Sequence, residues 1–216
     1  MFVTKHIGAA AAALFAAFAG TATAHNGLDL KEGWAGYSTP MVLSVNHGCK
    51  ASPVVGMRLK VPDGIVDAKA AYDPFWTIEY KMRKLDEPLM MHGRPVTEVV
   101  DEIVWKDPAR TVPADAWYPF KFRMTLPDEP GKVLHIRNIT VCEDGTDPYV
   151  DLPDEDLDIN DPEFATKVWA FMTATATPAP FLVIRAPEKK QYPWEWTPAQ
   201  ARGDGLASDQ GQARAE

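Results

Sequence analysis

The sequence has few cysteines, few histidines and no surplus of basic residues, and each shortage excludes a class of protein. It contains 2 Cys and 5 His in 216 residues, and 22 Lys and Arg stand against 30 Asp and Glu. An acidic chain is not drawn to phosphate backbones or anionic lipids, so nucleic acid is excluded as the main partner. The motifs of common enzyme classes are also missing: Gly-x-Ser-x-Gly, a glycine-rich phosphate loop and His-Glu-x-x-His. We therefore expect a protein that is not an enzyme, although a Ser-His-Asp triad needs no sequence motif and stays open.

Residues 1–24 have the plan of a secretory signal peptide. Lys5 lies before an apolar run over residues 8–20, and residues 21–24 end in small side chains. The run is shorter than the roughly 20 residues that a membrane span needs. We predict cleavage after Ala24, a periplasmic or secreted location, and a mature chain that begins at His25. No apolar run of membrane-spanning length follows.

The two cysteines, Cys49 and Cys142, are predicted to form an inter-strand disulfide. An even pair in an exported protein favours this pairing over a thiolate metal site, which usually contains a close Cys-x-x-Cys pair. The bond would close a loop of about 94 residues, worth roughly 4–5 kcal/mol in the chain-entropy model.

The mature chain is dominated by predicted strands. Proline, glycine and aspartate separate runs rich in Val, Ile, Thr and aromatic residues, and several runs alternate between apolar and polar side chains. The runs are 41–45, 54–61, 76–82, 98–105, 117–126, 133–141 and 181–184. One short helix is expected within residues 162–175. Short alternating strands of this kind predict an all-β domain, either a sandwich or a small barrel, over residues 25–186.

Two segments differ from the strands in composition. Residues 151–163 include seven acidic residues and no basic one, and they lack the glycine and distal glutamate of a calcium loop, so a solvated loop is favoured. Residues 187–216 are rich in Pro, Gln, Ala and Gly and are predicted to be a flexible tail. The aromatic residues Tyr192, Trp194 and Trp196 lie within this tail. They either pack back on the domain or form a recognition segment.

His25 is the strongest metal-ligand candidate because cleavage would place it at the amino terminus. One residue then offers an α-amine and an imidazole, which together close a chelate ring on a metal. A free α-amine has a pKa of about 7.7–8, so a strongly binding cation displaces its proton near neutral pH. Copper binds nitrogen donors most strongly among the divalent first-row metals, and Cu(II) favours tetragonal N and O geometry.

The other mature histidines are weaker candidates. Met90-Met91-His92 is either a soft Cu(I) site or, as we favour, a hairpin turn. His47 precedes the Gly48-Cys49 pair and is expected to make local hydrogen bonds. His135 lies inside a predicted strand and is expected to be structural.

Several motifs resemble, in order, those of the YcnI family. That family has a His-Gly-Cys-x-Gly-Ser-Pro turn and then a strand that ends in Pro-x-Gly-Val. Residues 46–53 (Asn-His-Gly-Cys-Lys-Ala-Ser-Pro) and 57–65 are similar to this pattern. Later matches are Val104-Trp105, 120–127, Cys142-Glu143-Asp144-Gly145, Leu152-Pro153 and Pro178-Ala179-Pro180. The likeness covers His25 to Ile184, most of the mature chain.

The resemblance implies a bacterial extracytoplasmic copper-binding domain with an immunoglobulin/cupredoxin-like β-sandwich. Family members bind Cu(II) through the histidine that follows the signal peptide, a position that His25 matches. The family places a tryptophan near the metal, and Tyr149 occupies that position here, as a possible oxygen ligand. The family's carboxylate position aligns with Lys60, so the nearby Asp63 and Glu79 are the candidate carboxylate ligands.

Three functions remain open from the sequence. The first is a periplasmic Cu(II) carrier or buffer that exchanges the copper ion with another envelope copper-handling protein. The second is an interaction module that needs no metal and docks an envelope partner through its strand edges or its Trp-rich tail. The third is a copper monooxygenase, which would need a second imidazole from His47, His92 or His135.

Overall fold

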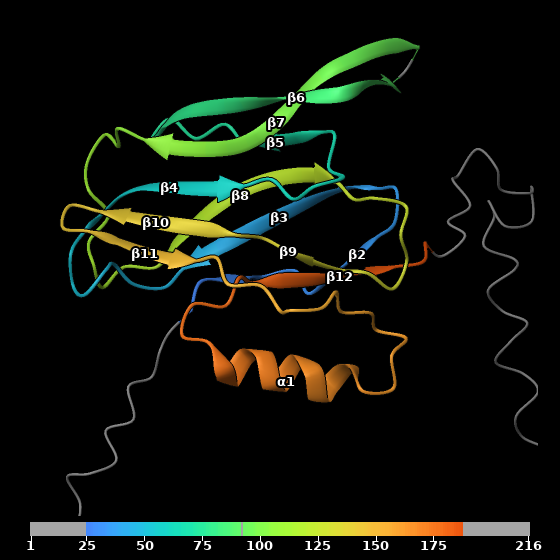
Figure 1. Ribbon diagram of the computed structural model, residues 1–216. Coiled ribbons are helices and arrows are strands. Elements are labelled where there is room, and N and C mark those ends of the chain that lie inside the picture. The colour runs from blue at the N-terminus through green and yellow to red at the C-terminus, as the bar shows by residue number, and fades with distance from the viewer. Residues whose placement is uncertain (1–24, 92, 188–216) are drawn as a thin grey trace, which may run out of the picture.

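The computed structural model describes residues 25–91 and 93–187. Two β-sheets enclose the hydrophobic core, a third small sheet closes one end, and one helix covers the outside of that end (Figure 1). The first sheet has the order β1 (Gly27–Leu28), β3 (Ser38–Val45), β8 (Tyr118–Thr125) and β5 (Ala68–Ala70). The second has the order β11 (Thr146–Tyr149), β10 (Asn138–Cys142), β4 (Val54–Lys60), β7 (Arg94–Lys106) and β6 (Thr77–Met91). The third consists of β2 (Glu32–Trp34), β12 (Phe181–Arg185) and β9 (Val133–His135).

The core forms where the alternating strands of the two main sheets face each other. In β8, Phe120, Phe122 and Met124 are buried while the lysine and arginine between them are exposed. Met57 and Leu59 of β4 are completely buried in the same way. This period-two pattern is the one read from the sequence, and it buries one face of each sheet. The structure is therefore a sandwich of separate sheets, and the predicted all-β class is confirmed.

The predicted disulfide is present between Cys49 and Cys142, whose Cα atoms lie 6.0 Å apart. Cys142 ends β10, but Cys49 lies in the turn between β3 and β4, so the bond joins a turn to a strand and not two strands. The turn is tight: a Cβ atom on Gly48 would lie 1.9 Å from the carbonyl oxygen of Ser52. Only glycine fits at that position.

The predicted strand at residues 133–141 is two strands in different sheets. β9 pairs with β12, whereas β10 pairs with β4 and β11. The backbone changes sheets at Ile136 and Arg137, and Ile136 remains completely buried there. A continuous apolar pattern therefore spans a change of sheet.

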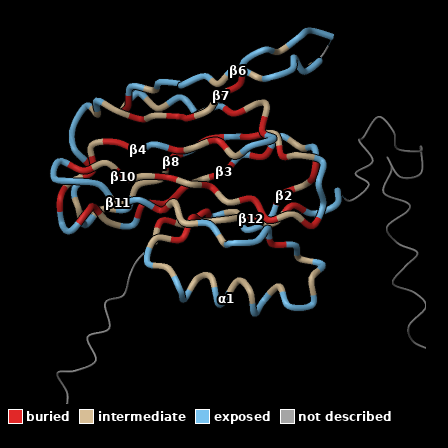
Figure 2. Tube along the Cα trace, in the orientation of Figure 1, coloured by how far each residue is buried: buried red, intermediate tan, exposed pale blue. Residues whose placement is uncertain are grey.

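β6 and β7 are longer than the predicted strands 76–82 and 98–105. They form a hairpin that extends past the rest of the sandwich (Figure 1). Its outer half is exposed on both strands (Figure 2). Met90 and Met91 end β6, and Gly93 has a positive φ of 75° next to β7, as a turn requires. His92 lies outside the described residues.

The predicted short helix is confirmed as α1 (Phe164–Ala174). Within the described residues, no helix is long and apolar enough to cross a membrane. Residues 1–24 and 188–216 lie outside the described part of the chain, so the signal peptide, the domain boundaries and the properties of the tail stay predictions.

Candidate metal centre

His25 is held in place by the residue that follows it. The side chain of Asn26 is buried, and its Nδ2 donates hydrogen bonds to Asn138 Oδ1 at 2.8 Å and to Thr140 Oγ1 at 2.9 Å. Both acceptors lie on β10 and face the core with about 1% exposure. β1 begins at the next residue and pairs with β3, where Gly27 lies opposite Ser44. The start of the domain is thus bonded to both main sheets.

The His25 side chain packs against Tyr149 of β11. The two ring centroids are 6.0 Å apart, and the rings meet edge to face at 80°. Asn46 donates from Nδ2 to the carbonyl oxygen of His25 at 3.2 Å. The Nε2 atom of His25 is buried and has no hydrogen-bond partner among the described residues. The fold therefore positions this imidazole by packing and leaves its Nε2 without a hydrogen-bond partner among the described residues.

A carboxylate that sequence reasoning missed lies beside Tyr149. Asp147 is two residues earlier on β11, so its side chain is on the same face of the strand. Cross-strand pairing places Asp147 opposite Thr140 and Tyr149 opposite Asn138, the two residues that hold Asn26. Burial raises the pKa of the Tyr149 hydroxyl, and the negative charge of Asp147 raises it further. The phenol is therefore protonated at neutral pH, and Asp147 is the carboxylate that lies beside it on β11.

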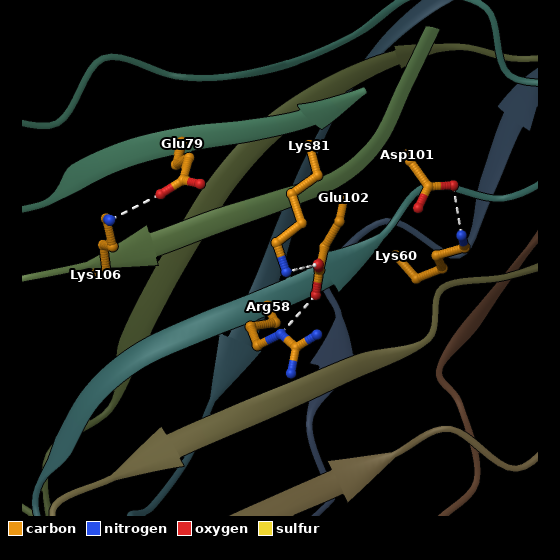
Figure 3. A network of polar contacts seen from close by, with 7 residues as sticks. All are labelled: Arg58, Lys60, Glu79, Lys81, Asp101, Glu102 and Lys106. Carbon is orange, nitrogen blue, oxygen red and sulfur yellow. Dashed lines mark hydrogen bonds and ion pairs between the residues drawn. The ribbon is translucent and has the colours of Figure 1, made fainter. Parts of the chain in front are cut away.

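Glu79 is not brought near His25. It lies on β6, at the opposite edge of the five-stranded sheet from β11, about 19 Å away at the usual spacing between strands. The side chain of Glu79 also points to the opposite face of the sheet from Tyr149. Glu79 lies across from Val104 of β7, which lies across from Arg58 of β4, and side chains in one such row share a face. Its carboxylate accepts a hydrogen bond from Lys106 at 2.7 Å, which lowers the pKa of Glu79 (Figure 3).

The outer face that carries Glu79 is a network of ion pairs. Glu102 contacts Arg58 and Lys81, each at 2.6 Å, and burial alone would raise the pKa of Glu102, but these hydrogen bonds lower it (Figure 3). Lys60 donates to Asp101 at 2.5 Å. Lys60 is therefore paired with Asp101, on the face of the sheet opposite to Tyr149.

Asp63 is in the exposed loop after β4. Its side chain is 88% exposed and lies 3.5 Å from the guanidinium of Arg83 on β6. The structure thus brings His25 and Tyr149 together, and it directs Asp63 and Glu79 toward cations of the β6–β7 hairpin.

The other described histidines have protein partners. His47 Nδ1 lies 2.8 Å from the carbonyl oxygen of Gly48, as expected for local hydrogen bonding. His135 packs against Phe171 and Phe181, and burial lowers its pKa. Among the described residues, no three side chains of His, Cys, Asp or Glu form a metal-binding group.

Residues 25–168 match the model of a protein family described as a domain of unknown function, DUF1775. The chain belongs to the DUF1775 family. The YcnI family is this same family, so the resemblance seen in the sequence is confirmed. The match begins at His25 and includes the disulfide, Asn26, Asp147 and Tyr149.

A solved structure supports the fold of this DUF1775 member. It is the crystal structure of an uncharacterized protein from Nocardia farcinica, described as having an immunoglobulin-like fold. The two are 17% identical with a TM-score of 0.52, and the match covers 75% of this chain and 99% of that one. At this identity the likeness shows the fold alone, and the predicted immunoglobulin-like sandwich is confirmed. No curated protein matches the chain.

Proposed function

We propose that the mature chain is an extracytoplasmic Cu(II) carrier or buffer, and that it binds the ion through His25. The observation that carries the proposal is the buried hydrogen bonding of Asn26 to Asn138 and Thr140. Chain termini usually fray unless they are tied down. Cleavage after Ala24 would here create a terminus whose second residue is fixed in the core, so the terminal histidine would have a defined place.

The chemistry of such a terminus suits Cu(II). The α-amine and Nδ1 of the imidazole close a six-membered chelate ring, and the ring proton then remains on Nε2, the buried nitrogen of His25. Two nitrogen donors from one residue favour copper over the other divalent first-row metals. A proton leaves the amine on binding, so copper affinity is expected to fall as the pH drops below about 7.7.

Oxygen donors would complete the coordination. Tyr149 lies against the His25 ring, but its raised pKa keeps it a neutral phenol, which is a weak ligand. Asp147, on the same face of β11, supplies a negative charge that stabilises a bound cation directly or through water. In this proposal Tyr149 forms a wall of the site, and Asp147 supplies its negative charge.

This donor set suits exchange of copper more than catalysis. One chelating residue with weak oxygen donors leaves coordination positions open, and a partner that offers stronger ligands can take the ion. The partner would be another envelope copper-handling protein. A disulfide-bonded domain behind a predicted signal peptide agrees with a periplasmic or secreted location.

Competition against a chelator of known Cu(II) affinity tests the proposal. The mature chain is compared with a chain that carries one extra residue before His25 and with His25→Ala. Both variants are expected to bind at least a hundredfold more weakly, because each removes one arm of the chelate. His47→Gln is the matched control and is expected to bind as the parent does. Equal affinity in all four proteins would refute the proposal, and a loss in His47→Gln would instead favour the two-imidazole site of a monooxygenase.

The metal-independent interaction module remains a second candidate because of the β6–β7 hairpin. Met82, Leu89 and Met90 are 51%, 43% and 68% exposed on it. Exposed apolar side chains on an edge strand are a common means of protein docking. If this is the function, Met82→Lys with Met90→Lys abolishes capture of the envelope partner while His25→Ala does not.

A further inference from the structure

The helix α1 leaves much of its apolar surface uncovered. Half-buried residues form one stripe at helical spacing, namely Phe164, Val168, Phe171 and Met172. No residue of the helix is fully buried (Figure 2). The side chain of Trp169 is 72% exposed. An 11-residue helix is not stable alone, so it depends on what packs against it.

A cavity of about 590 Å³ lies between α1 and the acidic loop that follows β11. Leu152, Leu157 and Phe171 supply apolar walls, and Ala170 and Ala174 line the helix side. The loop is tied to the end of the helix because Asp151 accepts hydrogen bonds from Thr175 and Thr177. The cavity is thus part of the folded structure and is large enough for aromatic side chains.

The rim of the cavity is negatively charged. Asp154 and Glu155 line it, and Asp154 forms no ion pair within the described residues. Lys167 also lines it, but its ammonium lies 2.9 Å from Asp161 and 3.7 Å from Glu155, so it is already paired. An occupant that combines aromatic groups with positive charge would match both the walls and the rim.

The end of β12 lies close to this cavity. Gly131 donates to Ile184 at 2.7 Å and accepts from Ile159 at 3.0 Å, and Leu157, which lines the cavity, accepts from Val133 of the same sheet. The structure describes the chain to Pro187, two residues past β12. From there, seven residues reach Trp194 and span up to about 25 Å when extended. From β12 across Gly131 to the backbone at Ile159 is two strand spacings, which is only about 10 Å.

We propose that this cavity is the docking site of the chain's own segment Lys189–Trp194. The sequence of this segment is Lys-Lys-Gln-Tyr-Pro-Trp. Tyr192 and Trp194 enter between α1 and the loop, and the two lysines lie at the acidic rim. The occupied cavity covers the apolar surface of α1 and holds the tail against the third sheet. This inference does not depend on copper.

Disulfide trapping in the full-length mature chain tests the docking. Both native cysteines are buried in their disulfide, so engineered thiols have no competitor. Glu195→Cys places a thiol next to the segment, and Ala170→Cys or Ala174→Cys places one at the exposed helix side of the cavity. The control pairs Glu195→Cys with Tyr72→Cys, which is 90% exposed and follows β5, away from α1 (Figure 1).

In dilute solution, the pairs at the cavity are expected to form an intramolecular disulfide at least tenfold faster than the control pair. Adding Lys189→Glu and Lys190→Glu is expected to slow trapping severalfold, whereas Arg202→Glu with Arg214→Glu, farther along the tail, is not. Equal rates at the cavity and control positions would overturn the proposal. Cross-linked dimers that form at a rate dependent on concentration would also overturn it, since the occupant would then be the tail of another copy.

Discussion

The side-chain amide of Asn26 donates to Oδ1 of Asn138 at 2.8 Å, 112 residues apart in sequence. This buried contact joins the first residues of the domain to the five-stranded sheet. Asn26→Ala removes it together with the bond to Thr140 and leaves buried acceptors unpaired. We expect a loss of about 2–4 kcal/mol in the free energy of unfolding, measured by urea denaturation.

Asn46→Ala is the matched control for Asn26→Ala. Its amide donates to the carbonyl oxygen of His25 at 3.2 Å, but in an exposed setting. Water replaces that bond, so the expected loss is under about 1 kcal/mol. Losses of equal size in the two variants would contradict the account of how the start of the domain is held.

Ala51 is predicted to destabilise the turn that contains Cys49. Its φ is 69°, in the left-handed region that costs a residue with a Cβ roughly 1–2 kcal/mol. Ala51→Gly relieves this cost, and the greater chain entropy of glycine in the unfolded state offsets part of it. We expect a net gain of about 0.5–1 kcal/mol in unfolding free energy. Ala70→Gly in β5 is the control and is expected to change stability in the opposite direction.

The hydroxyl of Tyr118 is predicted to make stability depend on pH in the alkaline range. It donates to Asp73 Oδ2 at 2.6 Å and accepts from Trp76 Nε1 at 2.8 Å. Burial, followed by the hydrogen bond to Asp73, raises the pKa of Tyr118 to about 12. The folded protein keeps this proton between about pH 10 and 12, where the unfolded chain has lost it. The unfolding free energy should therefore fall as the pH rises through that window.

Urea denaturation at pH 9, 10 and 11 measures this dependence. Tyr118→Phe is expected to remove the additional decline above pH 10, and Tyr72→Phe, at a 90% exposed side chain, is expected to retain it. The same slope in Tyr118→Phe and in the parent would show that the decline has another source.

Asp147 is predicted to contribute charge to the copper site. Asp147→Asn should weaken Cu(II) binding about fivefold, since a partly solvated charge interaction is worth roughly 1 kcal/mol. In the metal-free protein it should also lower the pKa of Tyr149, because the Asp147 charge is one of the causes that raise it. Absorbance titration at alkaline pH, with Tyr149→Phe to assign the signal, checks the second effect. Asp144→Asn, in the exposed turn before β11, is expected to change neither.

The sequence predicted the parts of the fold that depend on local patterns. Alternation in residues 120–126 marked a half-buried strand, and β8 has that pattern of burial. The disulfide followed from the predicted export signal and an even cysteine count. The switch at Ile136 and Arg137 could not be seen, because an apolar residue is buried in either sheet. β1, β2, β5 and β11 are too short, at two to four residues, to give a periodic signal.

The site was predictable only in part for a related reason. Position after the predicted cleavage site identified His25, and alignment with a motif identified Tyr149. Asp147 could have been found from its two-residue spacing to Tyr149, which places both on one face of a strand. Glu79 was selected by nearness in sequence to an aligned position, but cross-strand register puts it on the other face of the sheet. Such a relation depends on pairing across five strands and has no local signature.

Electron paramagnetic resonance of the mature protein with one equivalent of Cu(II) tests the central claim most directly. The spectrum is compared with that of a chain carrying one extra residue before His25. We predict a tetragonal signal with nitrogen hyperfine structure in the mature protein and a different, oxygen-rich signal in the extended one. Identical spectra from the two proteins would contradict the account, because the amino terminus of His25 would then take no part in binding copper.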